Sequence, residues 1–324
     1  MLHLRATITR IQSGQKIENP LLDEVQVSLG LLYEVVADTI KTFEKEHYLI
    51  FSEDEIAFIA MHLGAIMQSQ VYVKVPTKIA IVCQHGMATS RLLLSRVEAL
   101  LPSHDISGPY ALSEFKNLSP MNVFDYVITT SPLGIENELV VHPIMTNNDI
   151  TLIEKTIWNY TYWKQCDILI NNYRVNQEEM ISMKDMIKKQ HIVLSKESYN
   201  YKQAIKVAAQ VLVDDGIIEN TYVEKMIWAV ETLGPYMVIL PKVAFVHAGA
   251  EDGVNRNGIS LLRLDSPILF GKENTAPVQA IFVIASKSRE DRGLLKLVKI
   301  LEEKNKTTML LTTNNIDDIL TLKG

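Results

Sequence analysis

The chain has only two cysteines among 324 residues, Cys83 and Cys166, which leaves no disulfide framework and favours a reducing, cytoplasmic compartment. No apolar run approaches the ~18 residues that a membrane span needs, and Met1–Arg10 is too mixed and polar for a secretory signal. We therefore expect no membrane insertion. Basic stripes with interleaved aromatic residues are also missing and the net charge is −6, so this chain alone does not predict nucleic-acid binding.

The sequence also has no internal repeats and no low-complexity tracts. Its eight histidines are scattered, so no metal-ligand spacing appears. We expect no metal and no cofactor. What the chain does have is length and apolar residues, 47% of the total, enough for two or three domains with packed cores.

The pattern along the chain predicts a multidomain protein with three regions. Residues 1–70 are expected to be all-α, since apolar residues recur at helical spacing in Leu29–Phe43 and after the capping-box pattern Ser52-x-x-Glu55. Residues 78–168 alternate strand and helix patterns and predict a small α/β domain with a mainly parallel sheet. Residues 178–324 mix both patterns and predict an α/β domain with a mixed sheet. Linkers are expected at Val71–Thr77, which contains Pro76, and at the polar stretch Asn171–Gln177.

Several individual elements are predicted within the second and third regions. The expected strands cover residues 79–83, the neighbourhood of 106, 126–130, 140–145, 236–240, 243–247, 258–264 and 278–285. The expected helices cover residues 90–101, the neighbourhood of 113, 148 to about 162, 201–214, 219–232 and 294–303.

Cys83 ends the apolar strand pattern Ile79–Val82 and is followed by a short loop and a helix. Backbone N–H groups that converge before a helix bind anions, and such a place favours a thiolate. One interpretation is a phosphoryl group carried on Cys83; the other is a buried free cysteine at a strand end. The candidate phosphate-loop residues are Gln84, His85, Gly86, Met87, Ala88, Thr89 and Ser90.

His247 closes the apolar run Val243–Val246 and precedes the small residues Ala248, Gly249 and Ala250. A neutral imidazole is a competent nucleophile toward phosphorus near neutral pH. The alternative is a strand-end histidine that makes one backbone hydrogen bond. His3 and His62 lie on helical patterns beside apolar residues, and by themselves they fit partly buried side chains better than functional ones.

Three segments resemble domains of the bacterial sugar phosphotransferase system (PTS). The first comprises Leu2–Leu4, Ile17–Leu22 and Asp54–Gly64, and it resembles the later part of a PTS regulation domain (PRD). The second is the Cys83 loop, which resembles the galactitol-type EIIB component. The third comprises Gly234–Ile239 and His247–Val254, and it resembles an EIIA domain of the mannitol/fructose and ascorbate type. The resemblance implies that His3, His62, Cys83 and His247 occupy phosphorylated positions.

This order of domains resembles that of multidomain transcriptional regulators of the mannitol and lichenan operons. It implies residues 1–70 as a partial PRD, 78–168 as an EIIB-like domain and 178–324 as an EIIA-like domain. It also implies a homodimer, phosphorylated by the phosphocarrier HPr and by sugar-specific EIIA and EIIB proteins. Such a protein is a phosphoacceptor and not an enzyme, and it binds DNA only through an N-terminal helix-turn-helix region missing from this chain.

The chain departs from the EIIA pattern at positions beside the histidine. The family usually has Pro before the histidine and Arg-Pro after the next alanine, where this chain has Val246, Gly249 and Ala250. A second histidine that assists transfer is replaced near Arg292-Gly293. We expect a domain that accepts a signal phosphate and transfers it poorly, in the C-terminal part of a longer regulator or the product of a split or shortened gene.

Two other functions remain open at this point. The chain could be a soluble IIAB component that relays phosphate to a sugar permease. Alternatively, its EIIA-like and EIIB-like domains could take no phosphate and serve as docking surfaces.

Overall fold

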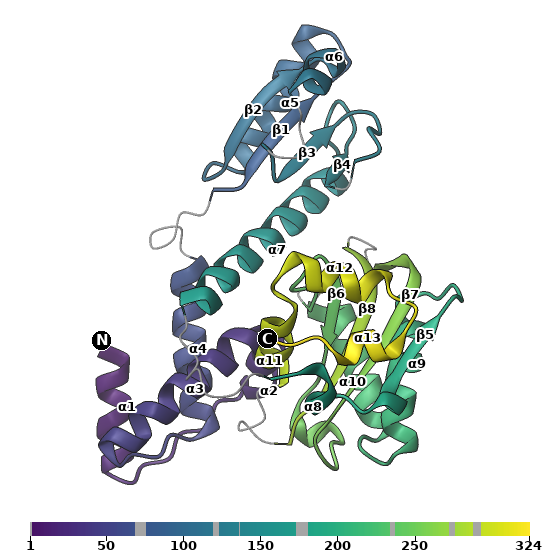
Figure 1. Cartoon of the computed structure of the whole chain (residues 1–324). Coiled ribbons are helices and arrows are strands. Elements are labelled where there is room, and N and C mark those ends of the chain that lie inside the picture. The colour runs from purple at the N-terminus through teal and green to yellow at the C-terminus, as the bar shows by residue number, and fades with distance from the viewer. Residues whose placement is uncertain are drawn as a thin grey trace. The chain divides into compact units, whose positions relative to one another are not determined.

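The computed structural model describes residues 2–68, 76–118, 123–135, 137–172, 181–233, 237–271, 276–287 and 293–324. The chain forms two compact units, one made of residues 1–68 with 166–324 and the other of residues 69–165 (Figure 1). The N-terminal helices and the C-terminal α/β domain therefore pack as one unit although they are far apart in sequence. Most of the two expected linkers lies outside the described residues.

Helices and the turns between them make up the described residues of the N-terminal segment, and no strand is assigned there, as predicted. It contains α1 (Leu2–Gln12), α2 (Leu22–Ser28), α3 (Gly30–His47) and α4 (Glu53–Gln68). Side chains at helical spacing on α3 and α4, such as Leu32, Val36, Ile56 and Ala60, meet in a common apolar core. Tyr48 ends α3 in the left-handed conformation, with φ of 53°.

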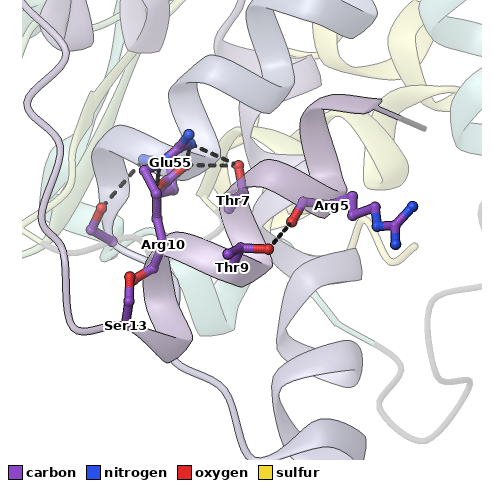
Figure 2. Close-up of polar contacts among 7 residues, drawn as sticks. Arg5, Thr7, Thr9, Arg10, Ser13 and Glu55 are labelled. Carbon is purple, nitrogen blue, oxygen red and sulfur yellow. Dashed lines mark hydrogen bonds and ion pairs between the residues drawn. The ribbon is translucent and has the colours of Figure 1, made fainter.

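A buried carboxylate holds α1 against α4 (Figure 2). Glu55 accepts a hydrogen bond from the Thr7 hydroxyl at 2.9 Å and two from the Arg10 guanidinium at 3.0 and 2.9 Å. The Ser52 hydroxyl accepts the Glu55 N–H at 3.3 Å, as the capping-box pattern predicts, but the Glu55 carboxylate is bound by the facing helix. Since the Glu55 side chain is only 3% exposed, these partners compensate its loss of hydration.

Residues 69–165 contain a four-stranded parallel sheet. The strands are β1 (Lys78–Val82), β2 (Asp105–Tyr110), β3 (Tyr126–Thr129) and β4 (Glu138–Val140), in the order β2-β1-β3-β4. Both faces of β1 are covered: Ile79 and Ile81 pack into one core, and Ala80 and Val82 into another. Such two-sided burial produces the continuous apolar run that predicts this strand.

Three helices accompany this sheet: α5 (Met87–Leu100), α6 (Leu112–Asn117) and α7 (Asn147–Asn172). Leu93 and Val97 of α5 and Ile153 and Ile157 of α7 share the core of Ile79 and Ile81. The Phe115 side chain of α6 belongs to the core on the other face.

The C-terminal domain is built on a mixed sheet, as predicted. Its strands are β5 (Ile192–Ser195), β6 (Lys242–Val246), β7 (Gly258–Phe270) and β8 (Ala276–Ala285). Their order is β5-β7-β8-β6, and the central β7–β8 pair is antiparallel while the outer pairs are parallel.

Helices cover both faces of this sheet. Leu262 and Ile281 pack with α9 (Tyr201–Asp214) and α10 (Asn220–Leu233), whereas Ile284 and Ile259 of the opposite face meet the start of α11 (Gly293–Leu301). This alternation follows the two-residue period of a strand. The remaining helices are α8 (Met183–Met186), α12 (Lys304–Thr312) and α13 (Ile316–Leu320), with short 3₁₀ turns at Lys189–His191 and Ala250–Asp252.

Several predictions about these elements are wrong, among them the end of β7, which continues to Phe270 and not to residue 264. α5 begins at Met87 and not at Ser90, and α7 continues to Asn172 instead of ending near residue 162. β4 ends at Val140, where a strand was expected to begin. Residues 237–240 form no strand: Leu240 makes an isolated bridge to Val243, because Lys242 has φ of 63° and turns the chain tightly.

No described helix has the length and apolar character of a membrane span. Over the same described residues, histidine, cysteine, aspartate and glutamate side chains do not gather into a group of three that could hold a metal ion.

Replacing Glu55 by Ala is expected to release α1. The change leaves Thr7 and Arg10 without their acceptor, and loss of one partner from a buried charged network costs roughly 2–4 kcal/mol. Native-state hydrogen exchange should show faster exchange throughout α1. Thr9→Ala is the matched control, since the exposed Thr9 hydroxyl only donates to the Arg5 carbonyl; equal exchange in both variants would contradict the role of Glu55.

Candidate functional sites

Cys83 lies directly after β1, and its main-chain N–H donates to the Tyr110 carbonyl at 3.1 Å. The residue is 5% exposed, and its sulfur lies 3.8 Å from His85 Nδ1. Cys83 also packs in the apolar core of the sheet. The thiol therefore belongs to the core at a strand end, as the second interpretation expects, and His85 contacts it from the loop; phosphorylation of Cys83 stays a prediction.

The loop after Cys83 is shorter than expected. Since α5 begins at Met87, the loop proper is Gln84–Gly86, and the next three residues form the first helical turn. N–H groups of a first turn have no intrahelical acceptor and are available to an anion. A side chain built on Gly86 would meet nothing within 4 Å, so the loop is open there.

The candidate loop residues differ in exposure. Gln84, His85, Gly86, Met87 and Ala88 are exposed and Thr89 is half-buried. Ser90 is buried, and its hydroxyl donates to the carbonyls of His85 and Gly86 at 3.0 and 3.3 Å. Ser90 thus braces the loop from inside.

His247 follows β6, as predicted, and both ring nitrogens lie near main-chain carbonyls. Nδ1 is 3.1 Å from the Phe245 oxygen, and Nε2 is 3.2 Å from the oxygen of Gln26 in α2. The first contact agrees with a strand-end histidine bonded to its own backbone. The second joins two segments separated by 221 positions in the sequence.

Buried hydrogen bonds brace the loop that carries His247. The Tyr222 hydroxyl, fully buried, accepts the Ala248 N–H at 3.0 Å and donates to the Ile284 carbonyl at 2.6 Å. The Gly249 N–H donates to Asp252 Oδ2 at 3.0 Å. Gly253 has φ of 119°, and a side chain there would approach Thr221 Oγ1 to 2.6 Å, so glycine is required.

Burial changes two pKa values at this site. It lowers the pKa of His247, although the carbonyls of Gln26 and Phe245 act in the opposite direction. The pKa of Asp23 in α2 is raised by burial and then by the nearby carboxylates of Asp252 and Glu251. A neutral imidazole, the nucleophilic form, is therefore favoured in a region that already carries acidic groups.

The other predicted positions belong to α1, α4 and the start of α11. His62 is an exposed residue of α4, and His3 belongs to α1 but its side chain lies outside the described residues. Gly293, near the expected second histidine, begins α11, whereas Arg292 lies outside the described residues. The partners found for the His247 ring come from Phe245 and Gln26, not from another predicted phosphoacceptor.

Comparison with known proteins identifies the two ends of the chain. Residues 1–66 match the PRD domain family, and residues 185–323 match the family described as phosphoenolpyruvate-dependent sugar phosphotransferase system, EIIA 2. The chain thus combines domain types of the sugar phosphotransferase system. It carries a PRD at its N-terminal end and an EIIA type 2 domain at its C-terminal end, and this second domain contains His247.

Two curated relatives agree with the C-terminal match, and one solved structure is similar to the same part of the chain. The ascorbate-specific PTS system EIIA component of Salmonella choleraesuis (strain SC-B67) is 28% identical over 134 residues, covering 40% of this chain and 87% of the relative. The component of the same name from Escherichia coli (strain K12) has the same identity and coverage, 28%, 40% and 87%. The crystal structure of IIA mannitol from Escherichia coli is 23% identical, covers 41% of this chain and 96% of its own, and has a TM-score of 0.37.

The parallel-sheet domain lies between the two matched segments. Its EIIB-like identity stays a prediction, based on the Cys83 loop, and so do the phosphorylated positions.

Removal of the Tyr222 hydroxyl is expected to loosen the His247 loop. Tyr222→Phe leaves the Ala248 N–H and the Ile284 carbonyl without their buried partner, at a cost of about 1–3 kcal/mol. Chemical denaturation of the C-terminal domain should report this loss. Tyr199→Phe is the control, because the half-buried Tyr199 hydroxyl bonds only to Ser195 and Glu197; equal destabilisation would argue against the bracing role.

The lowered pKa of His247 predicts a pH dependence of known sign. An unfolded histidine titrates near pH 6.5, so in acid the unfolded chain binds a proton more readily than the folded one. Stability from the neutral ring is present above about pH 6.5 and is lost as the pH falls. Nuclear magnetic resonance should give a titration midpoint below that of His247 in urea-unfolded protein; a higher midpoint would contradict the assignment.

Proposed function

We propose that this chain is the phosphorylation-controlled signal-input region of a sugar-responsive transcriptional regulator. The observation that carries the proposal is the joining of a PRD to an EIIA type 2 domain with a histidine at a strand end. A PRD is a regulatory module by resemblance, whereas EIIA domains interact with EIIB-type and HPr-type PTS proteins. Their combination in one chain favours control by phosphate over transport.

Phosphate enters on His247, Cys83, His62 and His3 in this proposal. HPr phosphorylates the PRD histidines, and sugar-specific EIIA and EIIB proteins phosphorylate Cys83 and His247. At each site a lone pair of the acceptor atom attacks phosphorus, while the bond between phosphorus and the donor breaks and its electron pair returns to the donor. Each phosphate adds about −1.5 to −2 charges, which shifts the packing of the surrounding helices.

The expected output is a change in transcription by a cytoplasmic homodimer. DNA binding belongs to a helix-turn-helix region of the regulator that is separate from these residues. The phosphate changes the equilibrium between two arrangements of the helical segments.

A transport function is the alternative. The ascorbate-specific relatives of the C-terminal domain favour it, because they are named as PTS EIIA components. A soluble IIAB component would pass phosphate to a permease and then to sugar. The PRD at the N-terminal end and the glycine near the expected second histidine favour the regulator instead. The third function, docking without phosphate, requires that alanine can replace Cys83 and His247 without a change in regulation.

Phosphate mapping tests these functions. After incubation of the full chain with phosphoenolpyruvate and the phosphorylated carrier cascade, we expect acid-labile phosphate on histidine and thiol-linked phosphate on Cys83. His247→Gln and Cys83→Ser should each remove their own phosphate, while His142→Gln, at an exposed histidine of the parallel-sheet domain, should change neither.

Other outcomes of the same mapping contradict the regulator. Absence of phosphate from all four residues excludes phosphorylation control. A chase of the phosphate onto sugar, after membranes with the permease are added, identifies the transport function. Unchanged transcription with alanine at Cys83 and His247 favours the docking function.

A further inference from the structure

One face of α2 and α3 lies against the His247 loop. Its members share the spacing that places residues on one side of consecutive helical turns. This surface, called the docking face below, consists of Asp23, Gln26, Val27, Gly30 and Glu34. All belong to the PRD, and every contact described below lies within one compact unit.

The docking face covers Nε2 of His247. The Gln26 carbonyl oxygen is 3.2 Å from this atom, and a side chain built on Gly30 would come within 2.9 Å of it and within 3.2 Å of the ring carbon Cε1. Nδ1 already lies against the Phe245 oxygen of the domain's own strand. In this arrangement main-chain atoms therefore close both nitrogens of the ring.

Two further contacts secure the docking face. Val27 is 6% exposed and belongs to the apolar core of the C-terminal domain, beside residues of α9, α10 and the sheet. The Glu34 carboxylate accepts the N–H groups of Leu294 and Leu295 at 3.3 and 2.7 Å, at the start of α11. A negative side chain at a helix N-terminus is stabilising. The PRD thus reaches both the loop and a helix of the C-terminal domain.

A departure from the EIIA sequence pattern fits this contact. Gly249 stands where the resemblance implies arginine, and a side chain at Gly249 would lie 3.2 Å from Cγ and Oδ1 of Asp23 and 3.0 Å from Asp252. Glycine leaves the space in which Asp23 lies. The change beside the histidine and the presence of the PRD are therefore connected through one contact.

We propose that the docking face of the PRD binds the unphosphorylated His247 loop in place of a phosphodonor protein, so that docking and phosphorylation of His247 exclude one another. The inference rests on the proposed function, in which His247 accepts phosphate. A phosphoryl group on Nε2 would occupy the space of the Gln26 carbonyl and the Gly30 backbone, so the PRD must leave before the donor can approach.

Transfer of the phosphoryl group separates the docked state from the phosphorylated state. The lone pair of Nε2 forms a bond to phosphorus, the bond between phosphorus and the donor's nitrogen or sulfur breaks, and that atom keeps the electron pair. Once the PRD has left, the single proton of the neutral ring lies on Nδ1, toward the Phe245 oxygen, and Nε2 carries the lone pair that attacks. The new negative charge lies on the loop that also carries Glu251 and Asp252, two carboxylates that already act on Asp23, and it opposes the return of Asp23.

Chemical accessibility of His247 tests docking without any phosphate. Diethyl pyrocarbonate modifies free imidazole nitrogens, and mass spectrometry of the His247 peptide of the full chain gives the rate. Gly30→Leu places a side chain where only a hydrogen fits and should raise this rate about tenfold or more, in proportion to the undocked fraction. Thr39→Leu adds the same side chain at an exposed position of α3 and should leave the rate unchanged.

A second variant distinguishes loss of docking from misfolding caused by the Gly30 substitution. Glu34→Ala removes the acceptor of the α11 N–H groups, and it should raise the rate in the same direction. Circular dichroism should show that the helices of both variants remain. Equal reactivity in the original chain, both variants and the control overturns the inference.

Phosphorylation by the carrier cascade separates this inference from the proposed function. Faster phosphorylation of His247 in Gly30→Leu and Glu34→Ala than in Thr39→Leu supports both. If the variants react faster with diethyl pyrocarbonate but His247 takes no phosphate, the docking contact is supported. The mutual exclusion of docking and phosphorylation is then overturned, together with the proposed role of His247. Phosphorylation at one rate in all variants keeps that role and overturns the exclusion.

Discussion

The neutral His247 ring has one N–H for two carbonyl acceptors, and this mismatch constrains how the larger unit can hold the side chain. His247 faces the oxygens of Phe245 and Gln26, yet its neutral ring has one N–H to donate. The contact with the helices therefore favours a proton on Nε2, while nucleophilic attack from Nε2 needs that nitrogen unprotonated. Packing, protonation and reactivity of this side chain are consequently linked, and burial keeps the ring mostly neutral.

The two best-defined candidate acceptors occupy similar places in different sheets. Cys83 follows β1 and His247 follows β6, and each of these strands pairs in parallel with a neighbour. Side chains at the carboxyl ends of such strands are fixed by buried backbone yet lie at the edge of the sheet, where ligands of α/β proteins bind. The buried strand Ile79–Val82 therefore positions Cys83, and the buried strand Val243–Val246 positions His247.

Sequence patterns predicted these strands well because two-sided burial leaves a continuous apolar run before a polar turn. The same reasoning misplaced the start of α5, since Met87, Ala88 and Thr89 have no apolar period of their own. It also missed the four-residue strand β5, whose pairing with β7 comes from distant residues. The Gln26 contact lay beyond prediction from sequence: it uses a main-chain oxygen, and every residue type carries one.

The parallel-sheet domain interrupts the larger unit in sequence, between residues 68 and 166. The PRD and the EIIA type 2 domain are thus tethered partners, and their encounter has an effective concentration that dilution cannot change. A contact too weak to form between separate molecules can therefore persist within this chain.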